Sequence, residues 1–293
     1  MKIERPQPIG DHTGDQGLVT AQEPLDLKIL IVEDNLTNQN VILKQLQTLG
    51  YSADLAADGQ AALHAIEQSP YDIVFMDCRL PVLDGFSATQ LIRQREQYLA
   101  PRKKLIIIAM TASDLPQDQA KAMAVGMDDY LHKPVRREML AATLQRWSQN
   151  LAVEHSFNPP RNKFLDSQNP VLLRASDADS LLPADGLELH LDLEHLHLLS
   201  DNNPEFELEL LALFMDDTRR HLEKLRQAIA SADASAAEQI AHHIKGASAS
   251  IGAYLIQQIA EEIEQIAHVH QLQDTSSFVA QLDRALHHIQ AFL

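Results

Sequence analysis

The sequence YDIVFMDCRLPVLDG, residues 71–85, decides how the first half of the chain folds. Its uncharged run Ile73–Met76 is too short for a helix and is typical of a strand buried on both faces of a parallel sheet. The run ends on Asp77, and α/β sheets bind ligands at the carboxyl ends of such strands. Asp is also common in turns, so this residue marks a site only if other strands bring partners to the same place.

Strands and helices alternate on both sides of this stretch. We expect four further strands at residues 28–32, 51–56, 105–109 and 129–131, each followed by a helix. Five strands alternating with five helices indicate an α/β domain with a doubly wound, five-stranded parallel sheet. The polar residues that follow its strands are Glu33, Asp34, Asp77, Thr111 and Lys133. Since the carboxyl ends of the strands share one edge, these residues should converge on one pocket, which favours a site over a simple turn cap.

The residue types at this predicted edge suit phosphoryl transfer. Glu33, Asp34 and Asp77 would repel one another unless a cation lay between them, and hard oxygen ligands without His or Cys suit Mg²⁺. Lys133 and Thr111 supply a positive charge and a hydroxyl for phosphoryl oxygens. An Asp carboxylate can itself attack phosphorus to form an aspartyl phosphate, and the cations would stabilise charge on the transferring group.

Residues 27–148 resemble the receiver domain of two-component response regulators. The resemblance rests on four elements in the order and spacing of that family. They are Ile31-Val32-Glu33-Asp34-Asn35, Met76-Asp77 with Leu80-Pro81 and Asp84-Gly85-Phe86, Thr111-Ala112, and Lys133-Pro134. The family has a flavodoxin-like fold, so the resemblance implies the strand order 2-1-3-4-5.

The resemblance also implies roles for the acidic residues. Asp77 would be the phosphoacceptor, and Asp34 and Asp77 would bind Mg²⁺. The backbone carbonyl of Arg79 would complete the protein ligands, and Glu33 would act through a metal-bound water.

Further roles follow from the same resemblance for the residues around the acceptor. Thr111 and Lys133 would contact the phosphoryl group, and Tyr130 would be the aromatic side chain whose rotamer responds to it. The peptide bond between Lys133 and Pro134 is expected to be cis.

Composition narrows the class of protein. The chain has 293 residues, enough for two domains, and its 24 Lys and Arg against 41 Asp and Glu give a net charge of -17. This charge argues against non-specific nucleic-acid binding. The sequence has one cysteine, no signal-like apolar segment at its start and no apolar run of membrane-spanning length. We therefore expect a soluble cytoplasmic protein that does not enter a membrane, with a disordered leader at 1–26 and a linker at 149–186.

From residue 187 onward the sequence is helical in pattern. A short helix is expected at 192–199, and Asn203 followed by Pro204 marks the start of a long amphipathic one. Three more helices are expected at 234–250, 254–268 and 276–292. Their apolar stripes and short loops predict an all-α second domain, an antiparallel four-helix bundle with one short added helix.

One helix of this bundle has an unusual polar face. At about 100° per residue, His242 points away from the apolar stripe that contains Ile240 and Ile244, and we expect it to face solvent. Lys245 and Gly246 lie beside it, although Gly in mid-helix costs about 1 kcal/mol relative to Ala. A surface histidine needs no explanation in a chain with 14 of them. The glycine and the lysine favour a functional histidine that a partner can approach.

Residues 187–293 resemble the histidine phosphotransfer (Hpt) domain. The resemblance rests on Ala241-His242-x-x-Lys245-Gly246-Ala247-Ser248-Ala249, on Ile251-Gly252-Ala253, and on Phe214, Asp217 and Thr218. It implies that His242 carries phosphate as a phosphoramidate and that Lys245 helps to neutralise it. His243 stands where a small polar residue is often found, so experiment must distinguish the two histidines, although the spacing to Lys245 favours His242.

Histidine pairs elsewhere are a weaker signal. His195 with His197, His268 with His270, and His287 with His288 could be taken for metal ligands. No two histidines lie three or four residues apart, the spacing that puts two ligands on one face of a helix. A solvated surface explains these pairs better.

Both resemblances together imply a phosphorelay protein that carries phosphoryl groups on Asp77 and His242. It would accept them from, and pass them to, partner two-component proteins, namely a histidine kinase or further receiver domains, and either direction is chemically available. The receiver would catalyse its own phosphorylation on Asp77. None of the ten glycines forms the G-x-G of a histidine-kinase ATP lid, so partners would have to supply the ATP chemistry. Two alternatives remain at this point: a phosphatase-like phosphate sink, and an adaptor bundle that works without phosphorylation.

Overall fold

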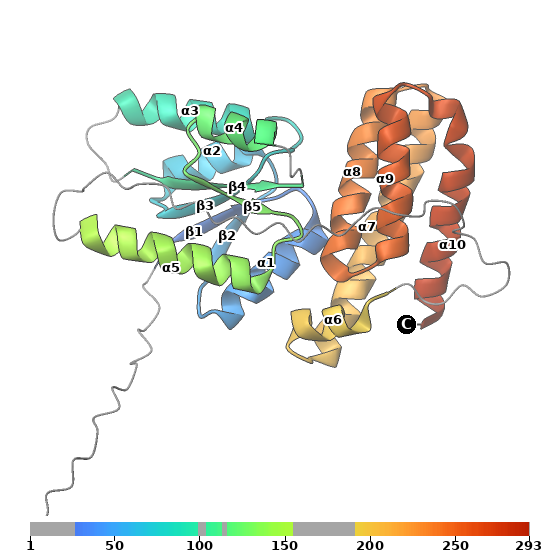
Figure 1. The fold of residues 1–293 in the computed structure, drawn as a ribbon, viewed down its shortest axis with the longest axis horizontal. Coiled ribbons are helices and arrows are strands. Elements are labelled where there is room, and N and C mark those ends of the chain that lie inside the picture. The colour runs from blue at the N-terminus through green and yellow to red at the C-terminus, as the bar shows by residue number, and fades with distance from the viewer. Residues whose placement is uncertain (1–26, 99–103, 113–115, 155–190, 293) are drawn as a thin grey trace, which may run out of the picture.

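A five-stranded parallel sheet forms the centre of the first half of the chain in the computed structural model (Figure 1). The structure describes residues 27–98, 104–112, 116–154 and 191–292, so the predicted leader and residues 155–186 of the predicted linker lie outside the described part. The strands are β1 (Ile29–Val32), β2 (Ala53–Ala56), β3 (Ile73–Asp77), β4 (Ile106–Thr111) and β5 (Asp129–His132). Their order, β2-β1-β3-β4-β5, confirms the prediction.

Helices cover both faces of this sheet, which explains why β1 and β4 carry no charged residue and β3 carries one only at its end. They are α1 (Leu36–Thr48), α2 (Gly59–Gln68), α3 (Gly85–Tyr98), α4 (Pro116–Ala124) and α5 (Arg137–Glu154). Alternate residues of β1 point to opposite faces: Ile29 and Ile31 pack toward α1 and α5, and Leu30 and Val32 toward α2, α3 and α4. Strand β3 is buried at all five of its positions, as a central strand of such a sheet must be.

The second half is the predicted helical bundle. Its helices are α6 (Leu193–Ser200), α7 (Pro204–Ala230), α8 (Ala234–Ile251), α9 (Tyr254–His268) and α10 (Ser276–Phe292), with a short 3₁₀ turn, η1 (Leu272–Asp274), that the sequence did not predict. Asn203 caps α7 through its side chain, as expected for the residue before Pro204. The bundle core includes the fully buried Phe214, Leu225 and Ile263.

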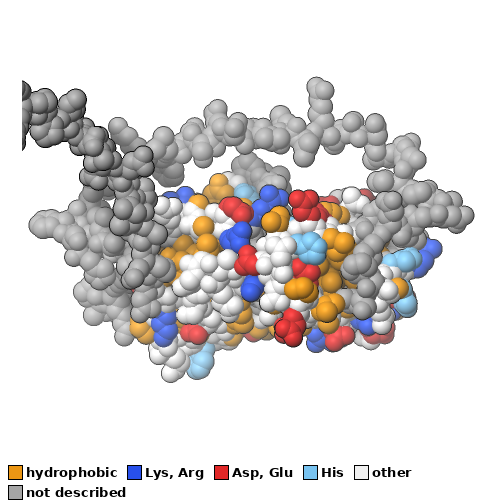
Figure 2. All heavy atoms as spheres, turned by 90° about the horizontal axis from the view of Figure 1, so that it is seen from below, with side chains coloured by type: hydrophobic (Ala, Val, Ile, Leu, Met, Phe, Trp, Pro, Cys, Tyr) orange, Lys and Arg blue, Asp and Glu red, His pale blue; other side chains and the backbone are white. Residues whose placement is uncertain are grey.

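Helix α1 joins the two halves (Figure 1). It packs against α6, α7 and α8, and its Val41 belongs to the hydrophobic cluster of the bundle. Next to this contact the Ser250 hydroxyl of α8 donates to Asn38 Oδ1 at 2.7 Å. At the start of α5, Arg137 Nη1 donates to Oδ1 of Asp201, the residue that follows α6, at 2.8 Å. The docked surfaces therefore combine an apolar contact with a hydrogen bond and a charge pair. Figure 2 shows that acidic and basic side chains are also interspersed across the middle of the outer face seen from below.

Two further observations concern the end of α5 and the character of the helices. Helix α5 continues to Glu154, six residues beyond the limit of 148 expected for the first domain. Within the described residues, none of the helices combines the length and the apolar character that a membrane crossing requires.

Candidate functional site

The polar residues at the ends of β1, β3 and β5 meet in one pocket. Lys133 Nζ donates to Glu33 Oε2 at 2.6 Å and to Asp77 Oδ2 at 2.7 Å. The carboxyl groups of Glu33 and Asp77 are almost fully buried, and the Lys133 side chain is 11% exposed. The structure therefore brings together residues that are as many as 100 positions apart in the chain.

The acidic residues of this pocket suit a hard divalent cation. Glu33, Asp34 and Asp77 each offer a carboxylate oxygen, and the three oxygens lie within 4.8 Å of one another. The backbone N–H of Arg79 donates to Asp77 Oδ1 at 3.0 Å. This clustered, all-oxygen donor set fits Mg²⁺ rather than a softer metal.

Three further predictions for the receiver concern Thr111, the peptide bond before Pro134, and Tyr130. Thr111 lines a cavity of about 490 Å³ together with Asp77. The peptide bond before Pro134 is cis, as predicted. Tyr130 packs with the hydrophobic cluster on the α2–α4 side of the sheet, and its ring meets the His132 ring edge-on with 5.4 Å between centroids.

Burial and charge act against each other in this pocket. Burial raises the pKa of Asp77 to about 7, with a smaller contribution from Glu33, while the Lys133 ammonium opposes the rise. Burial alone would lower the pKa of Lys133, but the charges of Asp77 and Glu33 outweigh it and raise that pKa above its ordinary value. Lys133 therefore stays charged, and the acceptor sits beside a fixed cation.

His242 lies on α8 and is held by the neighbouring helix α9. Its Nδ1 is 2.8 Å from Glu264 Oε1, and Lys245 Nζ donates to Glu264 Oε2 at 2.5 Å. Arg79 of the first domain reaches the same carboxylate, with 3.3 Å from its Nη1 to Glu264 Oε1. Burial lowers the pKa of His242, although Glu264 works in the opposite direction. Burial therefore favours a neutral imidazole, and the contact with Glu264 favours the tautomer that carries its proton on Nδ1.

The prediction that His242 faces solvent was wrong. Its helical phase is as expected, but the first domain docks on that face and leaves only 16% of the side chain exposed. His242 and Asp77 line two cavities together, one of about 110 Å³ that includes Lys133 and one of about 490 Å³ that includes Lys245. The two predicted phosphoacceptors therefore open onto the same space.

The neighbouring His243 has a different environment. Its Nε2 is 2.8 Å from Asp217 Oδ2 of α7, and its Nδ1 is 3.3 Å from Asp34 Oδ2 of the first domain. The amide nitrogen of Asn35 also lies 2.8 Å from Nε2. Burial alone would lower the pKa of His243, but the two carboxylates raise it to about 9. His243 is thus a cation between two acids and is less suited to be a nucleophile than His242.

Sequence reasoning missed the residues that orient these histidines. Glu264 is one of several acidic residues on α9, and His221 on α7 stacks on His243 with 3.8 Å between ring centroids. Which residues face each other across two helices depends on the packing of the bundle, and no motif in the chain marks it.

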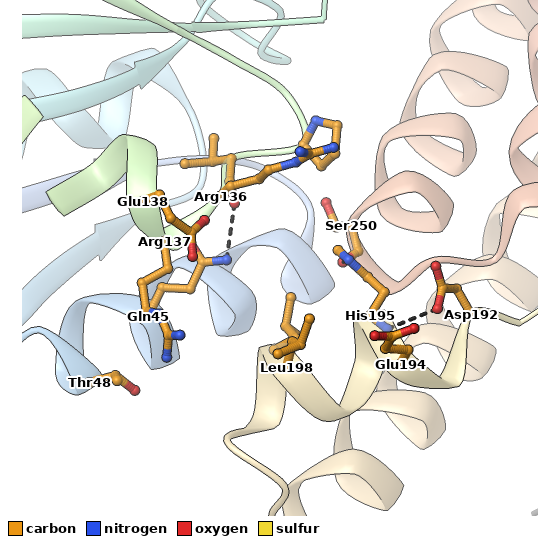
Figure 3. Close-up of a pocket in the computed structure, with 13 residues that line it drawn as sticks. Gln45, Thr48, Arg136, Arg137, Glu138, Asp192, Glu194, His195, Leu198 and Ser250 are labelled. Carbon is orange, nitrogen blue, oxygen red and sulfur yellow. Dashed lines mark hydrogen bonds between the residues drawn. The ribbon is translucent and has the colours of Figure 1, made fainter. Parts of the chain in front are cut away.

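Another cavity, of about 330 Å³, lies between the two halves on the side of α6. Figure 3 shows Gln45, Arg136 and Arg137 on one wall and His195, Leu198 and Ser250 on the other. Gln45 donates to the Val135 carbonyl at 3.0 Å, and His195 Nε2 is 3.0 Å from the Ser250 carbonyl. This cavity contains none of the predicted phosphoacceptors, whereas Asp77 and His242 both line the two cavities described above.

Comparison with known proteins agrees with the division of the chain into an α/β half and a helical half. Residues 29–145 match the response regulator receiver domain family, and residues 209–292 match the Hpt domain family. The sensor histidine kinase GacS of Pseudomonas protegens is 29% identical over 269 residues, which cover 90% of this chain and 27% of that protein. The hybrid signal transduction protein dokA of Dictyostelium discoideum is 37% identical over 162 residues, covering 52% of this chain and 9% of that protein.

One solved structure is similar in sequence to the first half of the chain. The receiver domain of the sensor histidine kinase PA1611 from Pseudomonas aeruginosa, described with a magnesium ion coordinated in its active site cleft, is 48% identical. It matches with a TM-score of 0.38 and covers 41% of this chain and 96% of that one. The chain spans between 4% and 27% of the length of the curated relatives.

The fold and the two family matches define the class of domain in each half of the chain. Residues 29–145 are a receiver domain of the two-component type, and residues 209–292 are an Hpt domain.

Proposed function

We propose that this chain passes a phosphoryl group directly between Asp77 of its receiver domain and His242 of its Hpt domain. The observation that carries the proposal is that the two residues line the same two cavities in the docked arrangement. Docking holds the reacting groups in one place, which replaces the encounter of two proteins by a step within one molecule.

The receiver pocket would load Asp77 through its own charges. The Asp77 carboxylate attacks the phosphorus of the donor, so a new O–P bond forms while the bond from phosphorus to the donor's leaving group breaks. Lys133 lies 2.7 Å from this carboxylate and would neutralise the phosphoryl oxygens. Asp34, Asp77 and the Arg79 carbonyl would hold Mg²⁺, with Glu33 acting through a water. When bound, this ion supplies further positive charge at the transferring group.

The transfer step would use the imidazole of His242. With its Nδ1–H donating to Glu264, the lone pair is on Nε2. Nε2 attacks the phosphorus of the aspartyl phosphate, so the N–P bond forms while the O–P bond to Asp77 breaks. The carboxylate regains its contact with Lys133, and Lys245 stands beside the new phosphoramidate. The reverse reaction uses the same groups.

Partner proteins would complete the relay. A histidine kinase or another receiver domain would supply or remove the phosphoryl group, as the family of each domain suggests. Asp77 is buried and His242 is mostly covered by the opposite domain. We therefore propose that the docked state serves transfer within the chain, and that the two domains separate when a partner binds either acceptor.

The test is a phosphorylation map of the full chain. Wild type, Asp77→Asn, His242→Gln and His243→Gln are incubated with a small phosphodonor and Mg²⁺, and acid-stable and alkali-stable phosphate are measured separately. We expect label on Asp77 and then on His242, with no histidine label in Asp77→Asn or His242→Gln and normal transfer in His243→Gln. Label that stays on Asp77 with intact His242 would overturn transfer within the chain, and rapid loss of label without an acceptor would favour a phosphate sink.

A further inference from the structure

A line of buried hydrogen bonds runs from the Hpt helix α8 to the phosphoacceptor. Ser250 Oγ of α8 donates to Asn38 Oδ1 of α1 at 2.7 Å, and Asn38 Nδ2 donates to Glu33 Oε1 at 2.9 Å. The other oxygen of Glu33 accepts from Lys133, which also donates to Asp77. Asn38 therefore connects the docked helix with the acidic pocket, although neither predicted site includes it.

The amide of Asn38 has a fixed orientation. The Glu33 carboxylate can only accept a hydrogen bond, so the NH₂ group of Asn38 must point toward it and the carbonyl oxygen must point away. The backbone N–H of Asn38 donates to Asn35 Oδ1 at 3.1 Å, which holds the residue at the start of α1. Asn38 thus offers an acceptor to the helix that docks on it, and this acceptor requires a donor.

The docked arrangement buries this contact. Asn38 is 5% exposed and Ser250 is 7% exposed. A Cβ atom at Gly246 would lie 3.7 Å from Asn38 Nδ2, so the backbone of α8 passes close to the amide. Burying an acceptor without a donor costs more free energy than the hydrogen bond contributes when it is made. Ser250 differs from Asn38 in this respect, because its hydroxyl is also 3.1 Å from the Gly246 carbonyl and can donate there when the domains separate.

We propose that Asn38 is the residue by which the receiver selects its Hpt helix, and that it favours a helix with a hydroxyl donor at the position of Ser250, about two turns after His242. A helix with an apolar side chain at that position would dock over an unpaired carbonyl oxygen. This contact therefore acts mainly by excluding unsuitable helices. The inference rests on the proposed function, because docking of the two domains is what brings Asp77 and His242 together.

The test measures docking of the full chain by energy transfer between one dye on each domain, without a phosphodonor. Salt is added until wild-type docking is about half complete, so that changes in both directions are visible. In Ser250→Ala the Asn38 carbonyl is buried without a donor, and docking should weaken about tenfold. In Asn38→Ala that carbonyl is absent and Ser250 donates to Gly246, so docking should weaken only about threefold. The double variant should dock as well as Asn38→Ala, which means that the second substitution rescues the first.

Ser248 provides a matched control on the same helix. It is buried, and its hydroxyl donates to the Ile244 carbonyl at 2.7 Å, the same four-residue bond that Ser250 makes to Gly246. Ser248→Ala should therefore dock as wild type does. Circular dichroism and urea unfolding check that each variant folds. If Asn38→Ala does not fold, Asn38→Leu replaces it, because leucine has nearly the shape of asparagine and no polar atom.

Two outcomes would overturn the proposal. One is equal docking in Ser250→Ala and wild type, and the other is a double variant that docks no better than Ser250→Ala. Failure of the proposed function has a different signature. In that case the phosphorylation map would show no transfer from Asp77 to His242 while the order of docking among the variants stayed as expected.

Discussion

The surroundings of Asp77 and His242 are built in opposite ways. The pocket of Asp77 is assembled from the ends of separate strands, and its contact between Lys133 and Glu33 spans 100 positions of the chain. Within the bundle His242 is oriented from the next helix, with only 22 positions between it and Glu264. The first site therefore exists only when the whole sheet has formed, whereas the contact that orients His242 needs only the packing of α8 against α9.

The glycine beside each acceptor shows the same contrast. A Cβ atom at Gly85 would lie 2.0 Å from the backbone oxygen of Asp77, so the chain must pass there without a side chain. A Cβ at Gly246 would meet Asn38 Nδ2 at 3.7 Å, an ordinary contact. Gly85 is thus required by the fold, while the docked structure leaves room for a methyl group at Gly246.

The largest effect is expected when Lys133, the cation beside Asp77, is removed. Lys133→Met should slow phosphorylation of Asp77 by a small phosphodonor about 100-fold, because the transition-state charge loses its closest positive partner. Lys121→Met is the matched control, since Lys121 lines the larger cavity beside Asp77 but lies over the Phe86 ring at 4.1 Å. Initial rates of acid-stable labelling measure both, and equal losses would show that only the overall charge of the cavity matters.

The two glycines should respond with opposite signs. Gly85→Ala forces its methyl group into the Asp77 backbone and should lower the free energy of unfolding of the receiver by about 1–3 kcal/mol. Gly246→Ala removes a helix-weakening residue and should raise that of the Hpt domain by up to about 1 kcal/mol. Urea unfolding followed by circular dichroism measures both changes. A loss of stability in Gly246→Ala would mean that the helix face needs the glycine for packing.

Glu264 tests whether the second site depends on one orienting carboxylate. In Glu264→Gln the amide can turn its NH₂ group to Nδ1 of His242, which favours the wrong tautomer, so transfer from Asp77 to His242 should slow about tenfold. Loading of Asp77 should not change. Glu264→Asp should recover part of the rate, and Glu261→Gln, whose carboxylate lies 3.9 Å from Lys245, is the control.

The tautomer of His242 provides a second measurement on Glu264→Gln. Nitrogen chemical shifts of His242 in NMR spectra should indicate protonation at Nδ1 in wild type and a shift toward Nε2 in Glu264→Gln. An unchanged tautomer together with slower transfer would mean that Glu264 acts through Lys245 instead.

The sequence predicts the receiver site better than the Hpt site, and for a physical reason. Strands of a parallel sheet must end at one edge, so the order of strands and the residues after them are enough to bring Glu33, Asp77 and Lys133 together. Helical phase correctly puts His242 opposite the apolar stripe, but phase within one helix does not say what covers that face. Glu264 and the docked receiver domain were missed because they depend on contacts between elements.

The smallest expected effect concerns His243 as the link between the two domains. Its pKa of about 9 lies above the ordinary value near 6.5 because Asp217 and Asp34 both favour the cation. Such a group stabilises the docked state fully below pH 6.5 and loses that effect as the pH rises through about 9. Only the Asp34 contact is broken when the domains separate, because Asp217 belongs to the same bundle, so docking should weaken only a few-fold across this window.

Mg²⁺-free buffer is required for this measurement, since an ion at Asp34 would compete with the imidazole. Energy transfer between one dye on each domain, recorded from pH 6 to 10, should fall with rising pH in wild type and stay flat in His243→Gln. His195→Gln is the control, because His195 lies between the two halves but bonds to the Ser250 carbonyl within its own bundle. A decline of equal size in His243→Gln would assign the pH response to other groups and show that the His243–Asp34 contact does not hold the two domains together.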